Sequence, residues 1–282
     1  MTVATSSTQA ALEGALATVE RATRRAGVTL LELRTPAETE RAADLLREVW
    51  RDREPPVPHN LLRTVQHIGG YVYGAYDESG ALLAASMALL ARDGLHSHIT
   101  GVVPAGQRRG LGYAVKQHQR LWALQRGLTT ISWTCDPLVR RNVTFNLHAL
   151  GAQVAEYLPD HYGAMTDGVN RGDESDRLEV RWDLLSPQAV QATSGRLPAV
   201  DGAGIPFAVR AAADGLPVSA TVVGASRLVE LPRDIEALRL ADAAAGLAWR
   251  RAVRDAVVPA LFEGAVLRGL TCEGALLLEV PR

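Results

Sequence analysis

Apolar residues recur at helical spacing near the start of the chain, and a helix start signal follows soon after. Leu12, Leu16 and Val19 lie three or four positions apart, and Gly27 stands where such a helix would end. The segment 35–38, Thr-Pro-Ala-Glu, is a capping box with proline at the first helical position. These signals predict one helix over residues 8–25 and a second helix from residue 36 onward.

Strand-like runs come next, and three of them are joined by very short connections. The runs 71–76, 81–90 and 95–103 are separated by DESG and RDG, which predicts an antiparallel meander. Helical and strand-like segments alternate around this meander, which predicts an α/β fold for the first part of the chain. The predicted order is strand 28–34, the helix from 36, helix 60–67, the meander, helix 113–126, strand 129–135, helix 139–150, and strands 153–158 and 177–184.

Residues 186–206 contain few large apolar side chains and several Gly and Pro residues, as linkers do. They predict a first domain over 1–185, a linker over 186–206 and a smaller α+β domain over 207–282. In that last part, one helical stripe predicts core packing: Trp249, Val253, Val257 and Leu261. Its predicted elements are strands 207–212, 217–223 and 226–231, a helical region 234–263 interrupted at Pro259, and a hairpin of 265–272 and 275–280.

The overall charge and the cysteines narrow the range of partners. The 282 residues include 30 Lys and Arg against 31 Asp and Glu, a formal net charge of −1, so neither a nucleic acid nor an acidic membrane is expected as a partner. Cys135 and Cys272 have neither a CxxC nor a Cys/His spacing, so no disulfide and no metal site is predicted. The start of the chain lacks a signal-peptide pattern, and no run has the roughly 18–20 apolar residues of a membrane span. We therefore expect a cytoplasmic protein.

The most specific pattern is VVPAGQRRGLG at residues 102–112, where a predicted strand runs into a helix. Its glycines let the backbone turn tightly, and the new helix offers unpaired amides and the positive end of its dipole. Arg108 and Arg109 add positive charge, so a pyrophosphate would suit this turn. The pattern lacks the GxxxxGK(S/T) of a nucleoside-triphosphate site, and the meander before it argues against a dinucleotide-binding βαβ unit. A solvated loop between strand and helix is the alternative.

The series Q/R-x-x-G-x-G/A, after a strand that ends in V-x-P, resembles the coenzyme A loop of the GNAT acyltransferase superfamily. The predicted order of elements is similar to that fold through residues 1–185. The resemblance implies a GNAT fold, with a central mixed, mainly antiparallel sheet flanked by helices, and N-acyltransferase activity. A bacterial branch with a C-terminal extension, some members of which neighbour N-succinylamino acid racemases, is similar to the stretches 97–102, 133–152, 162–172, 175–182 and 249–255.

The resemblance also implies how a donor substrate, acetyl-CoA or succinyl-CoA, would be held. Val102 and Val103 would contact the pantetheine arm, and the N–H group of Val102 would polarise the thioester carbonyl. Asn142 and Phe145 would lie beside the same arm, with a capping Asn and a core Phe as the alternatives. The pyrophosphate would be bound by Gln107, Arg108, Arg109, Gly110, Leu111 and Gly112.

An amine must lose its proton before it attacks a thioester, so a general base is expected. Strand alternation would place His96, His98, Thr100 and Val102 on one face of the strand 95–103. Related enzymes often carry a glutamate on this strand, and an imidazole suits the same task. His98 is the first candidate and His96 the second, and hydrogen-bonded packing histidines are the alternative.

The general acid departs from the superfamily pattern. Many members carry a tyrosine four residues before the glycine that ends the last cofactor helix, whereas here Leu147 stands four residues before Gly151. Tyr162 or a water molecule is a substitute. Alternatively the thiolate leaves unassisted, since a thiol pKa of about 8.5 already makes it a fair leaving group. Tyr157 is expected to pack.

The polar run from Tyr162 to Arg177 is long for a connection between neighbouring strands, which predicts a loop that binds the acceptor. Asn170, Arg171, Asp176 and Arg177 would hold an amino acid by its carboxylate and ammonium groups, and a solvated hairpin is the alternative. The sequence thus predicts an acyl-CoA-dependent N-acyltransferase for a small-molecule amine, foremost an amino acid. A homodimer is left open. A non-catalytic acyl-CoA-binding module with a sensor or structural role is the alternative function.

Overall fold

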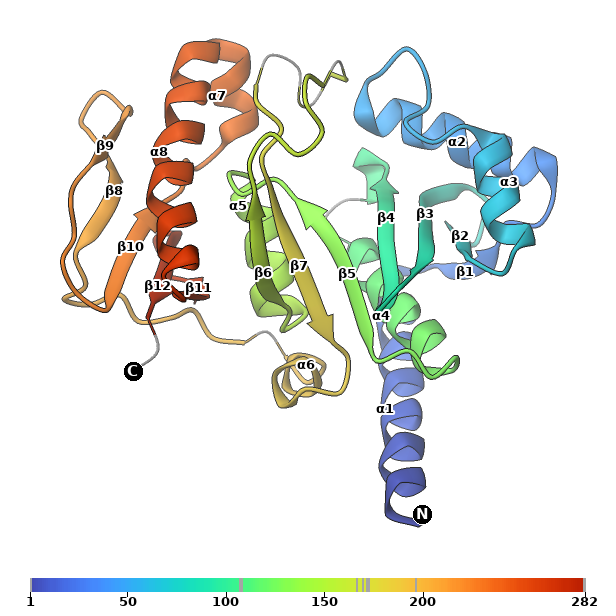
Figure 1. The fold of residues 1–282 in the computed structure, drawn as a ribbon. Coiled ribbons are helices and arrows are strands. Elements are labelled where there is room, and N and C mark those ends of the chain that lie inside the picture. Colours follow the sequence, from blue (N-terminus) through green and yellow to red (C-terminus); the bar gives the residue numbers. More distant parts are fainter. Residues whose placement is uncertain are drawn as a thin grey trace. The chain divides into compact units, whose positions relative to one another are not determined.

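The computed structural model describes residues 2–106, 109–165, 167–168, 170, 173–195 and 197–280. The chain divides into two compact units (Figure 1). The first unit comprises Met1–Trp133 and Asp183–Ser186, and the second comprises Thr134–Trp182 and Pro187–Arg282. Among the described residues, no helix combines the length and the apolar character that a membrane crossing requires.

The first unit contains the meander that the short turns predict, and the predicted elements are confirmed within a few residues. Its strands follow one another in the sheet as β1-β2-β3-β4-β5, antiparallel as far as β4, while β4 and β5 are parallel. The elements are α1 Thr2–Ala26, β1 Thr29–Glu32, α2 Pro36–Trp50, α3 His59–His67, β2 Tyr71–Tyr76, β3 Leu82–Ala91, β4 Gly94–Val102, a 3-10 turn Pro104–Gly106, α4 Leu111–Leu124 and β5 Thr130–Cys135.

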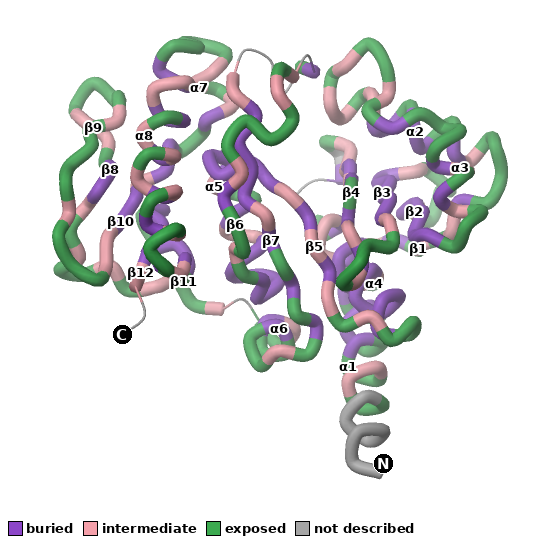
Figure 2. The backbone as a smooth tube through the Cα atoms, in the orientation of Figure 1, coloured by how far each residue is buried: buried purple, intermediate pink, exposed green. Residues whose placement is uncertain are grey.

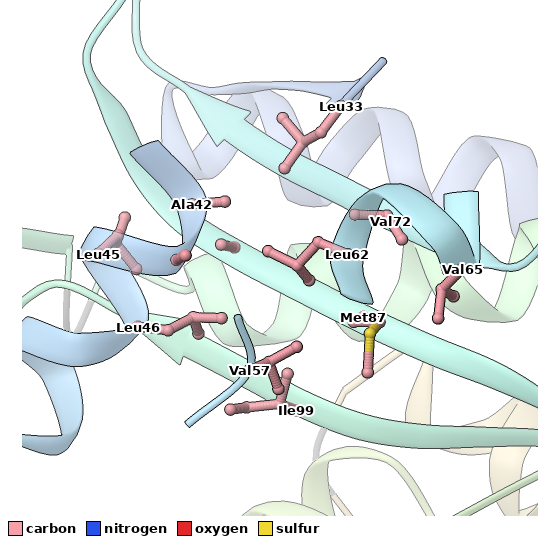
Figure 3. Close-up of a cluster of buried hydrophobic side chains, with 12 residues drawn as sticks. Leu33, Ala42, Leu45, Leu46, Val57, Leu62, Val65, Val72, Met87 and Ile99 are labelled. Atoms are coloured by element: carbon pink, nitrogen blue, oxygen red, sulfur yellow. The ribbon is translucent and has the colours of Figure 1, made fainter. Parts of the chain in front are cut away.

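Helices cover both faces of this meander. On one face, α2 and α3 bury a cluster that includes Leu46, Leu62, Met87 and Ile99 (Figure 3). On the other face, α1 and α4 pack over a second cluster, in which Leu111 lies among small residues of α1 and β3. Buried positions therefore run along most of β3, which has a helix layer on each side (Figure 2). Apolar burial on both faces explains why β3 is an almost continuous apolar run.

The helix signals in the sequence work as local chemistry predicts. Glu38 N donates to Thr35 Oγ1 at 3.3 Å, and Thr35 N donates to Glu38 Oε2 at 2.8 Å, which completes the capping box at the start of α2. The reciprocal bonds satisfy two amides that would otherwise lack a partner. Gly27 has a φ of +65° directly after α1, a conformation that glycine adopts without strain.

The second unit contains two strands of the larger sheet and a separate five-stranded sheet. The larger sheet is mixed, in the order β1-β2-β3-β4-β5-β7-β6, and the smaller one has the order β11-β12-β10-β8-β9. The elements are α5 Arg140–Thr144, a π-helix Phe145–Ala149, β6 Gln153–Leu158, β7 Arg177–Asp183, α6 Pro187–Ala192, β8 Phe207–Ala211, β9 Pro217–Ser219, β10 Ser226–Glu230, α7 Ile235–Ala241, α8 Ala243–Phe262, β11 Val266–Leu270 and β12 Ala275–Glu279.

The long helical region is interrupted at Asp242, so the predicted interruption at Pro259 is wrong. Asp242 has a φ of −150° and ends α7, while its carboxylate accepts from Ala245 N at 3.0 Å and caps α8. Pro259 lies within the last turn of α8. A proline there removes a single intrahelical hydrogen bond, whereas a capping aspartate stabilises a new helix start.

Residues 186–206 are tied to other parts of the second unit at several points. They include α6, and Leu197 N donates to His148 O at 2.7 Å while Val200 N donates to Leu270 O at 3.0 Å. The domain limits 1–185 and 207–282 stay predictions. The compact units place β6 and β7 with the C-terminal sheet.

Candidate active site

The turn between β4 and α4 presents a helix N-terminus that glycine shapes. Gly110 is the N-cap of α4 with a φ of +84°, and no side chain caps the helix there. Intrahelical bonding begins with Ala114 N donating to Gly110 O at 3.0 Å. The amides of Leu111, Gly112 and Tyr113 therefore precede the first intrahelical hydrogen bond and are available to an anion.

The space around this helix start is open. A Cβ atom added to Gly110 or Gly112 would meet no heavy atom within 4 Å. Only Gly110 has the left-handed backbone that strains other residues, whereas Gly112 has an unstrained backbone with open space beside it. The predicted contacts of Gln107 and Arg108 lie outside the described residues.

Arg109, the second arginine of the turn, lies against the end of α1. Its Nη2 atom donates to the carbonyl oxygen of Ala26, the last residue of α1, at 3.1 Å. A guanidinium there complements the negative end of a helix dipole. A guanidinium has five N–H donors, so this bond leaves others for a ligand.

The second half of β4 has an open edge. Within the described residues, the ladder between β4 and β5 consists of Leu95 with Ile131 and His96 with Ser132, while β4 stays paired with β3 up to Val102. The two parallel strands thus stop pairing at His96. A ligand with amide groups could pair with the exposed backbone of β4 beyond this point.

The antiparallel ladder shows which backbone groups face this open edge. Val103 N donates to Leu83 O at 3.0 Å, and the following pairs along the ladder are Val102 with Ala84, Gly101 with Ala85 and Thr100 with Ser86. Hydrogen-bonded and non-hydrogen-bonded pairs alternate in such a ladder. The N–H groups of Val102 and Thr100 therefore point away from β3, as a role for Val102 in polarising a thioester requires.

The predicted alignment of His96, His98, Thr100 and Val102 on one face is wrong, because β4 contains an extra residue. Met87 pairs with Ile99 but Leu89 pairs with His96, so both Ser97 and His98 lie opposite Ala88. His96 faces the side of Leu89, which packs with the cluster under α2 and α3. The side chain of Thr100 bonds Ser86 on the opposite face, under α4. A β-bulge of this kind shifts the alternation by one residue, which the sequence pattern does not reveal.

The two histidines differ in their surroundings. His96 Nδ1 lies 3.3 Å from Ser132 Oγ, so this ring is tied to the neighbouring strand. The His98 ring lies 6.3 Å from that of His96, centroid to centroid, and has no hydrogen-bond partner among the described residues. Although the His98 side chain is exposed, nearby protein atoms displace part of its water, and this desolvation lowers its pKa. The lowered pKa favours the neutral imidazole, which is the form that accepts a proton.

Sequence reasoning missed a buried polar chain beside β4, which we call the hydroxyl–amide chain: Lys116, Ser97, Gln119, Ser86 and Thr100. Its members lie on β3, β4 and α4, and all except Thr100 are buried. No motif in the sequence would have pointed to the chain, because it depends on the β3–β4 register and on the rotation of α4.

In the second unit, the structure brings Tyr162, Asn170 and Arg177 together. The Tyr162 OH group lies 2.9 Å from Thr134 Oγ1, and the Arg177 guanidinium lies 5.3 Å from the Tyr162 ring centroid. Arg177 Nη2 donates to Asn170 Oδ1 at 3.4 Å. Arg177 is buried, and within the described ranges no carboxylate forms a salt bridge with it. A buried guanidinium without a counter-ion is an attractive site for an anion. Arg171 lies outside the described residues.

Asp176 is committed to protein partners. It accepts from Tyr157 OH at 2.5 Å and from Asp160 N at 3.0 Å, and it pairs with Arg254 of α8. Burial alone would raise the pKa of Asp176, but the hydrogen bonds from Arg254 and Tyr157 lower it overall. Tyr157 is buried, as its predicted packing role requires.

Two further aspartates form a closed ionic cluster with α7 and α8, which we call the ionic tetrad: Asp136, Asp173, Arg239 and Arg250. Arg250 lies 2.8 Å from Asp136 and 2.7 Å from Asp173, and Arg239 lies 2.6 Å and 2.7 Å from the same carboxylates. Each side chain is at most 7% exposed. Burial alone would raise the pKa of Asp136, but Arg250 and Arg239 hold it well below its usual value.

The remaining predicted positions lie on the helical segment after β5. Asn142 belongs to α5 and is exposed, and its N–H group donates to Val139 O at 2.8 Å. Phe145 is half-buried and begins the π-helix, whose wider turn appears as Leu150 N donating to Phe145 O at 3.1 Å. Leu147, which takes the usual place of tyrosine, is buried. π-Helical turns often occur at functional sites.

Comparison with known families gives one match. Residues 15–138 match the family model described as an acetyltransferase (GNAT) domain. These residues contain β4, the glycine turn and α4. No curated protein matches the chain significantly.

Solved structures that match part of this chain include several acetyltransferases. The ribosomal-protein-S18-alanine N-acetyltransferase from Escherichia coli is 18% identical with a TM-score of 0.46, and the match covers 56% of this chain and 94% of that one. A phosphinothricin acetyltransferase from Sinorhizobium meliloti, in complex with AcCoA, is 15% identical with a TM-score of 0.45, over 55% and 87% of the two chains. A putative acetyltransferase from Acinetobacter baylyi ADP1 is 12% identical with a TM-score of 0.47, over 57% and 93%.

Proposed function

Through residues 15–138 this chain belongs to the GNAT acetyltransferase family, and we propose that it moves an acyl group from acetyl-CoA or succinyl-CoA to the amine of an amino acid. The reaction forms a C–N bond and breaks the C–S bond of the thioester. The amine gives up one proton, and the departing thiolate can take one up. The observation that carries the proposal is the glycine-opened start of α4, directly after the open edge of β4.

The donor would be held by the first unit. Within the described residues no acceptor binds the amides of Leu111, Gly112 and Tyr113, which would hold the pyrophosphate. The helix dipole favours that anion by roughly 0.3–2 kcal/mol. The N–H group of Val102 points to the open edge of β4, where it can donate to a thioester carbonyl. A donor aimed at the oxygen that becomes negative lowers the barrier to attack.

The amine has to be made neutral before it can attack. An amine with a pKa of about 10 is deprotonated in only about one molecule in a thousand at pH 7, which costs roughly 4 kcal/mol. We assign His98 as the general base, because its ring is exposed and has no hydrogen-bond partner within the described part of the chain. The alternative, His96, is tied to Ser132.

The role of His98 can be tested through pH. His98→Ala should lower kcat/KM about tenfold to a hundredfold near pH 7 and less at pH 9, where more of the amine is already neutral. His96→Ala is the matched control and should change kcat/KM less at both pH values. An equal loss at pH 7 and pH 9 in the His98 variant would contradict the assignment.

An amino-acid acceptor is proposed because of the buried guanidinium in the second unit. Arg177 has Asn170 and the Tyr162 ring beside it, and it could receive an α-carboxylate through the N–H groups that its bonds to Asp176 O, Met165 Sδ and Asn170 leave over. Asp176 is paired with Arg254, so the acceptor ammonium is not assigned to it. Tyr162, with its hydroxyl at 2.9 Å from Thr134 Oγ1, stays the candidate for protonating the thiolate.

The donor site has a sharp test at Gly112. Gly112→Glu places a carboxylate in the space proposed for the pyrophosphate and should weaken CoA binding at least about tenfold, measured by calorimetry. Gly112→Ala is the matched control, because its Cβ meets nothing within 4 Å and the backbone is unstrained. Equal affinity in the two variants would refute the donor site.

The rival function is a module that binds acyl-CoA without turning it over. A thiol-release screen of free amino acids and polyamines, with acetyl-CoA and with succinyl-CoA, separates the two. Release above the rate of hydrolysis supports the enzyme and identifies donor and acceptor. Tight CoA binding without release for any amine would favour the rival.

A further inference from the structure

We propose that Ser86 fixes the hydroxyl of Thr100 as a hydrogen-bond acceptor at the open edge of β4, and that this oxygen receives an N–H group of a bound substrate. The inference rests on the proposed function, since it concerns the same stretch of β4. Two sources offer such an N–H group: an amide of the thioester carrier and the incoming amine. Both are covered by the experiment below.

The direction of the hydroxyl–amide chain follows from its first member. Lys116 Nζ can only donate, and it donates to Ser97 Oγ at 2.8 Å. Ser97 then donates its own proton to Gln119 Oε1 at 3.0 Å, which places the amide nitrogen of Gln119 on the other side. Gln119 Nε2 donates to Ser86 Oγ at 3.0 Å. Every bond of the chain thus points toward Ser86.

Ser86 has one proton and two lone pairs, and its neighbours use all three. One lone pair accepts from Gln119, and the proton goes to Ile99 O at 3.0 Å. The oxygen of Thr100 lies 2.7 Å away, so Thr100 must be the donor in that contact. The opposite direction would leave Ile99 O without this bond. The arrangement with the most hydrogen bonds therefore turns the Thr100 proton inward.

This leaves the Thr100 oxygen with lone pairs, and no proton, for any further partner. Thr100 is half-buried, and its backbone N–H group points to the open edge, as does that of Val102 two residues later. A ligand group that meets the Thr100 side chain there must donate a hydrogen bond. Amide and amine N–H groups satisfy this condition, whereas a carbonyl or a carboxylate does not.

The first arm of the test is calorimetric titration with CoA. Thr100→Val keeps the shape but removes the acceptor, and it should weaken binding about twofold to tenfold if the carrier supplies the N–H group. Thr100→Ser restores a hydroxyl and should restore the affinity. Ser86→Ala keeps the Thr100 hydroxyl but frees its rotation, so its loss should be smaller than that of Thr100→Val.

The second arm is steady-state kinetics with the amino acid that gives the fastest thiol release. If the amine supplies the N–H group, Thr100→Val should raise KM for that amino acid about twofold to tenfold, with CoA affinity unchanged. The matched control is Thr39→Val, which removes another buried hydroxyl of the first unit, one that donates to Pro36 O at 2.9 Å. It should change neither constant.

The outcomes separate this inference from the function on which it rests. A wild-type protein that neither binds CoA nor releases thiol overturns the proposed function. A wild-type protein that does both, with Thr100→Val equal to wild type in CoA affinity and in KM, overturns the role of Thr100 alone. A loss that Thr100→Ser fails to restore also overturns it, because the hydroxyl would then not be the group that matters.

Discussion

Both compact units contain a buried polar network, and the two networks compared below are built from different groups. The hydroxyl–amide chain of the first unit has a single formal charge, on Lys116, and its other members are neutral. The ionic tetrad of the second unit has two carboxylates and two guanidinium groups. Both are withdrawn from water, so each member depends on its partners to offset the loss of solvation.

The two networks have different structural roles. A chain of neutral donors and acceptors sets the direction of hydrogen bonds, because each hydroxyl has a single proton to place. A closed set of charges fixes position, because removing one member leaves an opposite charge buried and uncompensated. The tetrad joins Asp136 and Asp173 to α7 and α8, and so ties the loop before β7 to the C-terminal helices. The hydroxyl–amide chain instead sets the hydrogen-bonding role of one oxygen, that of the Thr100 hydroxyl group.

The largest expected effect is the loss of stability when one cation is removed from each network. Arg250→Met leaves Asp136 and Asp173 with one guanidinium between them, and should lower the free energy of unfolding by about 3–5 kcal/mol. Lys116→Met leaves only neutral groups behind and should lower it by about 1–2 kcal/mol. Urea denaturation of both variants at pH 7 measures the two losses.

A neighbouring arginine is the control. Arg251 is 61% exposed and pairs with Glu174 at 3.0 Å, so Arg251→Met on the same helix should lose less than about 1 kcal/mol. Equal losses for Lys116→Met and Arg250→Met would show that the two networks do not differ in the way argued here.

The sequence predicted the elements of both units well, because their signals are local. The capping box at Thr35, the short turns of the meander and the glycine after α1 act over a few residues. The predictions failed where a single residue changes a pattern. The extra residue at Ser97 and His98 places Thr100 and His96 on opposite faces of β4. The long helical region is interrupted at Asp242, whereas the interruption was predicted at Pro259.

In the predicted site, too, the local signals could be recognised and the long-range contacts could not. The glycine turn could be recognised, since helix starts of this kind have a compact signature, and the structure adds that Gly112 provides room and Gly110 conformation. Neither polar network could be recognised. Asp136 and Arg250 lie 114 residues apart and are brought together only by the fold. Asp176, predicted to bind the acceptor, is instead surrounded by partners from α8 and the loop, which its sequence context does not reveal.

A smaller effect separates the two units by pH. In the first unit, His118 contacts the Tyr71 hydroxyl at 2.9 Å, and burial lowers the pKa of His118 from 6.5 to about 4. Between these values the unfolded chain binds a proton that the folded chain does not, so stability falls as the pH falls. The shift corresponds to about 3 kcal/mol at pH 4. In the second unit, Asp136 has a lowered pKa, and its contribution is lost only below the ordinary aspartate pKa of 3.8.

Replacing His118 by asparagine should therefore remove most of the loss between pH 6.5 and 4, except the smaller part that belongs to His98, and leave the loss below pH 4 in place. Asparagine offers a hydrogen-bonding group to Tyr71 but does not titrate, which makes the variant a test of the proton and not of the contact. Urea denaturation at half-unit steps of pH gives both slopes. If the variant loses stability between pH 6.5 and 4 as steeply as the wild type, the proton uptake belongs to another group. The acid sensitivity of the first unit would then not arise beside α4.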